Sequence, residues 1–278
     1  REAVHEARRL YDDEARALVT RVPGLVDVRE GGLAPGSTRA RWYRPTTAMA
    51  RPVVLFLHGG SWMFGSIDSH DNLCRHLAER SSCCVLSLGY RLSPEAPFPA
   101  GLEDASRAVD WVRAHGVGLG GDPERLALAG DSAGANIAAA AVLRGAGPQG
   151  LLMLYPSVDA RMGSRSWEEL GDGYRLTRED TRWYYDQYVP APVSQAQPLV
   201  SPLLADDLTS FPATFVQTAE LDPLRDEAES FAARLHAAGI DAETRRYPGV
   251  IHGFMRFEEL DAAQEAIDDA ARWLRSHL

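Results

Sequence analysis

Short apolar runs rich in β-forming residues alternate along the chain with longer stretches of helical periodicity. The runs predicted as strands are 52–58, 83–90, 125–130, 150–156, 213–219 and 241–248. The stretches predicted as helices are 71–80, 102–116, 132–144, 226–239 and 257–278. Strands joined through a helix lie parallel in one sheet, and the helices then cover both of its faces. The alternation therefore predicts an α/β fold with a mostly parallel central sheet.

Three parts of the chain depart from this alternation. Residues 37–45 alternate polar and apolar side chains, as an antiparallel edge pair does. Residues 1–20 read as an isolated charged helix, and 157–200 is rich in aromatic side chains: Trp167, Tyr174, Trp183, Tyr184, Tyr185 and Tyr188. We expect a single domain over 1–278, in which residues 1–24 and 157–200 form a small cap above a site at the strand ends.

The composition limits the partners and the location of the protein. A net charge of -10 disfavours nucleic acid and anionic membranes, which both call for basic patches. No apolar run approaches the ~18 residues of a transmembrane helix, so no stable membrane insertion is expected. Cys74, Cys83 and Cys84 predict buried free thiols and a cytoplasmic location. The chain begins at Arg1 without a methionine, which indicates upstream removal of residues and leaves a removed signal open.

One serine stands between two glycines where a predicted strand passes into a predicted helix. The stretch Gly130-Asp131-Ser132-Ala133-Gly134 matches G-x-S-x-G in the context that this motif requires. The tight turn lifts the hydroxyl clear of the sheet, and the helix N-terminus directs N–H groups at a negative charge forming beside it. Ser132 is therefore the candidate nucleophile.

A serine hydroxyl is a poor nucleophile and needs a base, which an acid orients. His252 lies in a glycine-containing loop between the last predicted strand and the last helix, from where its imidazole can reach Ser132. His76, His115 and His236 fall within helical patterns and are expected on the surface. His252 is therefore the candidate base.

The acid is expected between the serine and the histidine in chain order, as in other proteins with this turn. Asp222 follows a predicted strand and precedes Pro223, a position that could also serve only to cap the next helix. Glu220 and Asp226 are rival acids, although Asp226 is expected inside that helix. Asp222 is the preferred candidate.

A second glycine-rich loop follows another predicted strand, within residues 54–66. Its glycine pair, Gly59 and Gly60, permits backbone N–H groups to aim inward at a developing oxyanion, where one such donor contributes roughly 3–4 kcal/mol. Together with the serine, the histidine and the acid, this loop predicts nucleophilic hydrolase chemistry.

Five motifs in this order resemble the hormone-sensitive-lipase-like branch of the α/β-hydrolases, which contains carboxylesterases and lipases. The resemblance runs from about residue 37 to the C-terminus and rests on HGGSW (58–62), YRLSPEAPFPA (90–100), GDSAG (130–134), DPLRDE (222–227) and HGF (252–254). It implies an α/β-hydrolase fold with a small helical cap, and it implies a triad of Ser132, His252 and Asp222. No metal and no organic cofactor are implied.

The resemblance also implies an oxyanion hole. Its donors would be the N–H groups of Gly60, Ser61 and Ala133, with Gly59 shaping the loop. The family usually has a third glycine where this chain has Ser61, whose Cβ restricts the backbone and crowds the acyl pocket. The N-terminus supplies one cap helix where the family commonly has two.

The expected function is hydrolysis of small to medium acyl or aryl esters through an acyl-enzyme. Apolar substrate contacts are expected from Trp62 and Phe64 in the turn and from Trp183 and Tyr184 in the cap. HGGSW also resembles the loop of kynurenine formamidases, so hydrolysis of an N-formyl arylamide is an alternative. An acyltransferase, a lyase and a non-catalytic receptor on the same scaffold are further alternatives. A homodimer through the edge strand and closing helix rests on analogy.

Overall fold

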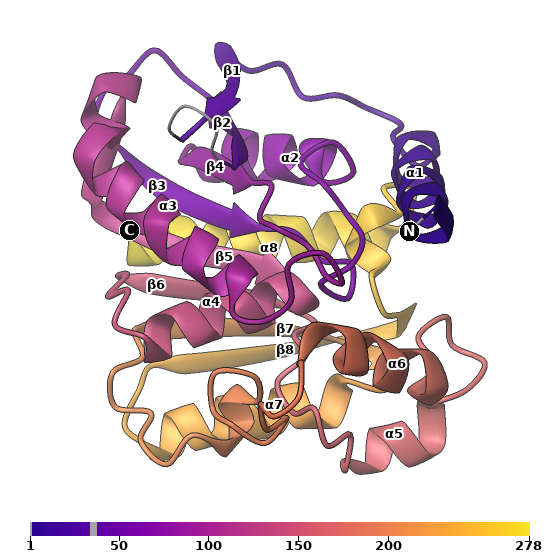
Figure 1. Ribbon diagram of the computed structural model, residues 1–278. Helices are drawn as coiled ribbons and strands as arrows, with labels where there is room; N and C mark the ends of the chain where they lie inside the picture. The colour runs from indigo at the N-terminus through magenta and orange to yellow at the C-terminus, as the bar shows by residue number, and fades with distance from the viewer. Residues whose placement is uncertain (1, 34–37) are drawn as a thin grey trace.

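The computed structural model describes residues 2–33 and 38–278. Within these residues, eight strands form one sheet in the order β1-β2-β4-β3-β5-β6-β7-β8 (Figure 1). Their bounds are β1 Asp27–Gly32, β2 Arg39–Arg44, β3 Arg51–Leu57, β4 Cys84–Leu88, β5 Gly121–Asp131, β6 Gly150–Leu154, β7 Ala213–Leu221 and β8 Ala242–Ile251. The pairs β1–β2 and β2–β4 are antiparallel, and every other neighbouring pair is parallel. The predicted mostly parallel sheet is therefore confirmed.

The helices overlap the predicted stretches, except for two helices within residues 157–200 that the periodicity did not predict. Their bounds are α1 Glu2–Ala17, α2 Asp71–Ser81, α3 Ala100–His115, α4 Ala133–Leu143, α5 Arg165–Leu170, α6 Arg178–Tyr188, α7 Arg225–Ala237 and α8 Asp261–His277. Short 3₁₀ turns are η1 Gly116–Leu119, η2 Pro202–Leu204 and η3 Phe254–Arg256. The closing helix begins at Asp261, four residues later than the periodicity predicts, because η3 and a turn intervene.

The sheet separates two apolar layers, because successive side chains of a strand point to opposite faces. Val53, Leu55 and Leu57 of β3 pack with α3, α4 and α7, whereas Val54 and Phe56 pack with α2 and α8. Helices thus cover both faces, as the alternating sequence predicts. The buried layer against α2 and α8 also contains the free thiols of Cys74 and Cys83, and Cys84 lies in the other layer.

The packing of α2 corrects one expectation. His76 of α2 is buried, with 2% of its surface exposed, although its helical position led us to expect it at the surface. The arginine one turn later, Arg80, reaches Gln264 and Asp268 of α8, so this face of α2 points toward a neighbouring helix.

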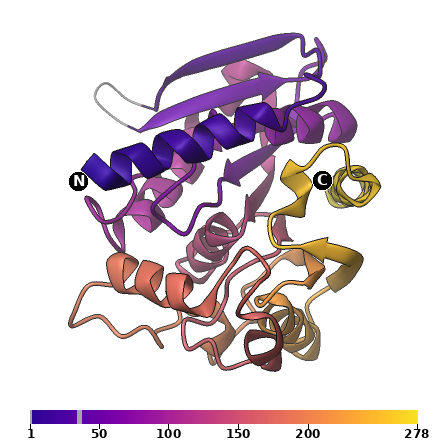
Figure 2. The same ribbon diagram turned by 90° about the vertical axis from the view of Figure 1, so that its right-hand side faces the viewer.

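The carboxyl ends of the parallel strands meet at one edge of the sheet. This edge carries the loops that follow β3, β5, β7 and β8, and ligand sites of open α/β sheets lie at such an edge. Figure 1 shows α1 and α6 at the end of the sheet toward which β3 and β8 point, and in Figure 2 this end faces the viewer. The candidate triad and the candidate oxyanion residues follow these strands, whereas the candidate contacts Trp183 and Tyr184 lie on α6, after β6.

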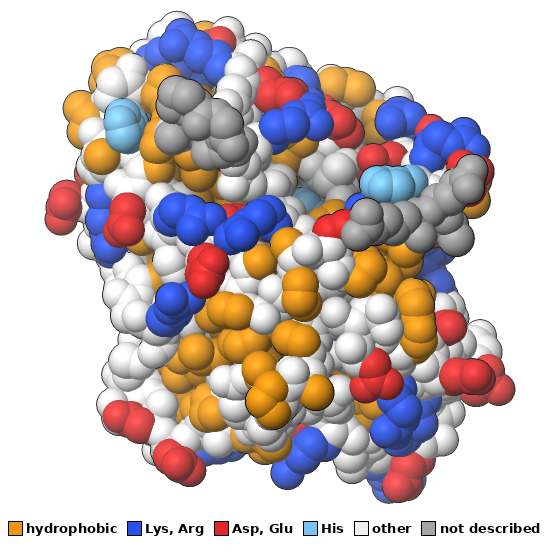
Figure 3. Space-filling model, in the orientation of Figure 1, with side chains coloured by type: hydrophobic (Ala, Val, Ile, Leu, Met, Phe, Trp, Pro, Cys, Tyr) orange, Lys and Arg blue, Asp and Glu red, His pale blue; other side chains and the backbone are white. Residues whose placement is uncertain are grey.

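The molecular surface is mixed in charge. On the face seen in Figure 3, acidic and basic side chains are interspersed, and apolar side chains gather below the centre. Within residues 2–33 and 38–278, no helix is both long and apolar enough to cross a bilayer.

Candidate active site

Ser132 occupies a strained turn between β5 and α4. Its backbone has φ 53° and ψ -118°, a conformation that L-residues rarely adopt. The flanking glycines make the turn possible: a Cβ on Gly130 would overlap the backbone of Gly134, and a Cβ on Gly134 would overlap the carbonyl oxygen of Leu57. Both glycines are therefore required by close backbone packing around the serine.

Three side chains form a continuous hydrogen-bonded chain at the strand ends. His252 Nε2 lies 2.9 Å from Ser132 Oγ, and His252 Nδ1 lies 2.7 Å from Asp222 Oδ2. Asp222 is buried, and its other oxygen accepts the Leu224 N–H at 2.9 Å. An edge-on contact with the Tyr155 ring, at 5.1 Å between centroids, further fixes the imidazole. This is the geometry in which a base can take a serine proton while a carboxylate holds the base in place.

The rival acids are engaged elsewhere. Glu220 Oε2 accepts the Gly249 N–H at 2.7 Å. Asp226 lies in α7, as expected, where it accepts the Ser166 N–H at 2.9 Å and pairs with Arg225. The structure therefore brings only Asp222, of these three carboxylates, into contact with the histidine.

The loop after β3 turns sharply beside the serine. Gly60 has φ 119°, and a Cβ there would overlap the backbone of Phe64. Ser61 follows with φ 53°, in the left-handed region that favours glycine. The Gly59 N–H donates to Asp131 Oδ1 at 2.7 Å, so this group fixes the loop and is not available to a ligand. Ala133 begins α4, and the first N–H groups of a helix lack partners within it.

A buried polar network supports this loop, and sequence reasoning did not find it. Asp131 accepts the Gly59 N–H and lies 3.2 Å from His70 Nε2. Burial opposes ionisation of Asp131, but His70 and the Gly59 N–H outweigh burial and hold the pKa of the carboxyl below its usual value. His58 stacks on Tyr90 beside this pair, and burial lowers the pKa of its imidazole to about 3. In the sequence, the one signal for this network was the position of Asp131 between the predicted strand and the candidate nucleophile.

Ser132 opens into a cavity of about 470 Å³, here called the Ser132 cavity. Its apolar walls include Leu10 and Tyr11 of α1, Phe64, and Tyr184 of α6. Charged side chains also line it: Glu14, Asp131, Arg175 and Arg256. The cavity therefore joins the serine and the histidine to a surface that is apolar on one part and charged on another.

The two tryptophans expected to contact substrate lie outside this lining. Trp62 is buried, and its ring stacks on Tyr188 at 4.4 Å and lies tilted against Tyr185 at 4.7 Å between centroids. The positive φ of Trp62, 58°, turns the side chain toward the aromatic rings of α6 instead of the cavity. Trp183 is 48% exposed, because its helical neighbour Tyr184 takes the inward position. Of the four expected contacts, Phe64 and Tyr184 reach the cavity.

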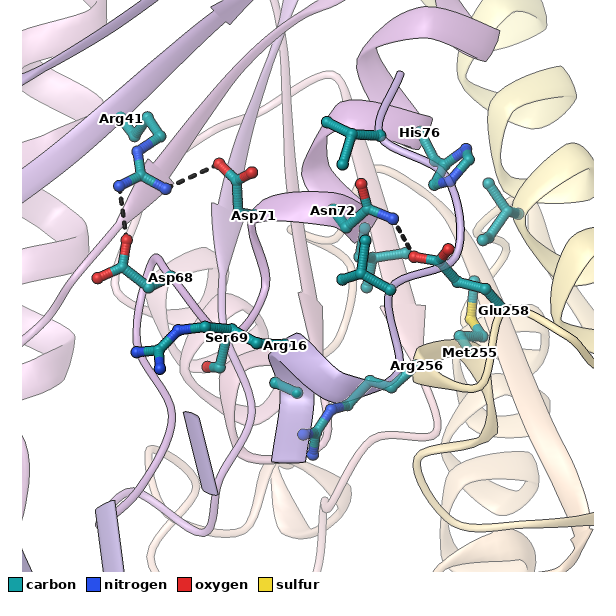
Figure 4. A pocket seen from close by; sticks show the side chains of 15 residues that line it. Arg16, Arg41, Asp68, Ser69, Asp71, Asn72, His76, Met255, Arg256 and Glu258 are labelled. Atoms are coloured by element: carbon teal, nitrogen blue, oxygen red, sulfur yellow. Dashed lines mark hydrogen bonds and ion pairs between the residues drawn. The ribbon is translucent and has the colours of Figure 1, made fainter. Parts of the chain in front are cut away.

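A second cavity of about 470 Å³ lies between α1, α2 and the segment before α8 (Figure 4). Asn72 donates to Glu258 in its wall, and Arg41 joins Asp68 and Asp71. Arg256 lines both cavities, and α1 contributes residues to each. The N-terminal helix is thus a shared wall between the two spaces.

Within the described parts of the chain, no group of three or more His, Cys, Asp or Glu side chains is placed to hold a metal ion.

Comparison with known proteins agrees with this geometry. Residues 54–256, more than half of the chain, match the profile of a family described as having the alpha/beta hydrolase fold. The carboxylic ester hydrolase LipN of Mycobacterium tuberculosis is 38% identical over 280 residues, which cover 95% of this chain and 74% of that protein. The ethyl acetate hydrolase of Pseudomonas putida is 34% identical over 290 residues, covering 98% of this chain and 90% of that protein.

A solved structure extends the similarity to three dimensions. EstE1, a thermostable carboxylesterase cloned from a metagenomic library, superposes with a TM-score of 0.93 at 39% identity, covering 99% of this chain and 97% of that chain. The sequence profile, the curated relatives and this structure agree on one family. The chain belongs to the hormone-sensitive-lipase-like branch of the α/β-hydrolases and is a carboxylesterase.

Proposed function

We propose that this carboxylesterase acts through an acyl-enzyme formed on Ser132. The observation that carries this proposal is the hydrogen-bonded chain from Ser132 Oγ through His252 to the buried Asp222. His252 Nε2 accepts the serine proton as Oγ attacks the ester carbonyl, and it then donates that proton to the leaving alcohol. Water attacks the acyl-enzyme by the same route, which releases the acid and restores the serine.

Three backbone N–H groups are proposed to stabilise the oxyanion. Gly60, Ser61 and Ala133 flank the serine on the loop after β3 and at the start of α4. The role of Gly59 is to fix this loop, because its N–H is already donated to Asp131. Preorganised donors of this kind act only on the charge that develops in the transition state, which is why they accelerate the reaction.

Small to medium acyl or aryl esters are the proposed substrates. A cavity of about 470 Å³ lies in the usual range of small-molecule sites, roughly 300–1,000 Å³. Leu10, Phe64 and Tyr184 offer apolar contacts to an acyl or aryl group. The name of the Pseudomonas putida relative, an ethyl acetate hydrolase, points to small esters as well.

We further propose that residues 1–278 form one domain, with residues 1–24 and 157–200 as its cap. In support, α1 contributes Leu10, Tyr11 and Glu14 to the Ser132 cavity, and α6 contributes Tyr184. Arg175, just before α6, bonds Glu14 of α1 at 2.7 Å, so the two parts touch each other above the serine. A cap of this kind excludes water from the reacting ester.

Steady-state hydrolysis of p-nitrophenyl esters from acetate to decanoate tests the proposal, with Ser132→Ala as the matched variant. We expect one preferred chain length and a loss of about 10³-fold or more in kcat in a variant that stays folded. Turnover that persists in Ser132→Ala would contradict the assigned nucleophile. No turnover of any ester by the wild type would direct the search to an N-formyl arylamide or another acyl acceptor.

The cytoplasmic location and the homodimer stay predictions. Three free buried cysteines, Cys74, Cys83 and Cys84, suit a reducing compartment. Cell fractionation tests the first prediction, and light scattering coupled to size-exclusion chromatography tests the second.

A further inference from the structure

Arg256, at the end of η3, is a buried cation in the wall of the Ser132 cavity. Its side chain is 9% exposed, and its Nε and Nη2 have no hydrogen-bond partner among the residues that the structure describes. The guanidinium lies over the Tyr11 ring, 4.2 Å from its centroid. The carboxylate nearest to it is Glu14, whose Oε2 stands 3.7 Å from Nη2, beyond hydrogen-bond distance.

The guanidinium of an arginine keeps its positive charge inside proteins. Buried charges are ordinarily paired and hydrogen-bonded, since an unpaired one is costly to bury. Arg256 meets neither condition fully. Because surrounding atoms cover Nε and Nη2, an anion in the cavity would meet the part of the Arg256 side chain that lines it.

The carboxylates that line the same cavity are committed to other groups. Glu14 Oε2 accepts a hydrogen bond from Arg175 Nη2 at 2.7 Å. Asp131 accepts the Gly59 N–H and lies beside His70. Neither carboxylate is paired mainly with Arg256. Of the two arginines that line the cavity, Arg256 therefore has the positive charge that is less neutralised by nearby carboxylates.

The second cavity carries charges of both signs. Its wall has the carboxylates of Asp68, Asp71 and Glu258 beside the guanidinium groups of Arg16 and Arg41, and Arg41 pairs with Asp68 and Asp71. Figure 4 shows the Arg256 side chain extending away from the Asn72–Glu258 pair. An anion bound by Arg256 would thus lie on the Ser132 side.

We propose that the preferred esters of this site carry a carboxylate, which Arg256 binds while the ester carbonyl sits at Ser132. The proposal rests on the ester hydrolysis proposed above and names its substrate class. Guanidinium and carboxylate match in shape and charge, and such pairs fix orientation as well as affinity. The reaction consumes one water and releases an alcohol, a second carboxylate and one proton. The charged group can stand on the acyl half, as in the half-ester of a dicarboxylic acid, or on the alcohol half, as in an O-acyl hydroxy acid.

Two matched pairs of esters distinguish a charge on the acyl half from a charge on the alcohol half. Monoethyl succinate and ethyl 4-oxopentanoate differ in the charge of the acyl half, and O-acetyl glycolate and acetoxyacetone differ in the charge of the alcohol half. Initial rates in a pH-stat give kcat/KM for each ester. We expect the wild type to prefer the charged member of at least one pair, and that preference to fall as salt is raised.

Arg256→Met removes the charge while keeping the length of the side chain. We expect it to reduce kcat/KM for the charged ester about 10- to 100-fold relative to its neutral partner, the range of a hydrogen bond to a charged group. Arg256→Lys should retain part of the preference. Arg16→Met is the matched control, because Arg16 lies on α1, a helix that borders both cavities, but lines the second cavity and not the Ser132 cavity. A ratio of charged to neutral kcat/KM that is equal in wild type and Arg256→Met would overturn the proposal.

A binding measurement keeps this result separate from the proposed chemistry. Calorimetric titration of Ser132→Ala with monoethyl succinate and O-acetyl glycolate reports recognition without turnover. Binding that is lost on adding Arg256→Met supports the proposal whether or not Ser132 is the nucleophile. Equal binding with and without Arg256→Met overturns the proposal. A salt-independent preference of the wild type for both neutral esters also overturns it, and this second measurement does not depend on the folding of any variant.

Discussion

Gly134→Ala tests whether the tight turn at Ser132 depends on close backbone packing. The added Cβ would lie closer than 3.0 Å to the carbonyl oxygens of Leu57 and His58, a separation that real Cβ atoms essentially never show. Backbone atoms cannot rotate away, so α4 must shift against the end of β3. Overpacking of this kind costs roughly 1–3 kcal/mol. The same shift moves Ser132, two residues earlier, relative to the loop at Gly60, so kcat should fall as well.

The stability of the variant is measured by urea unfolding and its activity by p-nitrophenyl butyrate hydrolysis. Gly163→Ala is the control, because its Cβ would meet nothing within 4 Å. We expect Gly163→Ala to change the free energy of unfolding by no more than about 0.5 kcal/mol, as surface substitutions do. A Gly134→Ala protein with wild-type stability and wild-type kcat would refute the packing argument for the turn.

Three further substitutions test other parts of the site and the fold. Asp222→Asn should lower kcat by as much as about 10⁴-fold in steady-state assays, because the imidazole loses its orienting partner, whereas Glu220→Gln should not; the reverse result would reassign the acid. Ser61→Gly removes the Cβ from a residue at φ 53°, and it should shift the acyl-chain preference toward longer p-nitrophenyl esters; an unchanged profile would show that Ser61 does not crowd the pocket. Burial raises the pKa of Glu227 from 4.5 to about 8, so the folded state binds the proton more tightly and stability should fall as pH rises from about 5 to 8. Urea unfolding across that pH range should lose this slope in Glu227→Gln, and a slope that persists would point to another group.

The order of elements was predictable from sequence because buried parallel strands form short apolar runs that turn residues separate. The same property located Ser132, Asp222 and His252, since each follows a strand and parallel strands end at one edge. Their contact within hydrogen-bond distance needed the structure. Residues 27–32 were not predicted as β1, because a strand ending in two glycines has no apolar alternation and gains its pairing from β2.

Side-chain direction was much harder to predict. Trp62 and Phe64 stand two positions apart in one turn, yet only Phe64 faces the cavity. The backbone at Trp62 adopts a positive φ, and no local pattern announces this. Trp183 and Tyr184 are adjacent on α6, and a short helix that borders both solvent and protein gives no sequence signal for which of the two turns inward.

The polar groups that tertiary packing buries could also not be predicted from the sequence. The helical position of His76 predicted a surface side chain, and its burial follows from the packing of α2 against α8. Arg256 lies just beyond the histidine loop. The sequence does not show that Glu14, the carboxylate near it, is bonded to Arg175 of a distant segment. Such groups depend on contacts between parts of the chain that sequence periodicity does not relate.

The most direct test of the acyl-enzyme on Ser132 is mass spectrometry of protein quenched during the first turnover of p-nitrophenyl acetate. We expect the intact protein to gain one acetyl group during the burst, and peptide mapping to place that group on Ser132. A burst of p-nitrophenol with the acetyl group on another residue, or with none on the protein, would contradict the proposed mechanism.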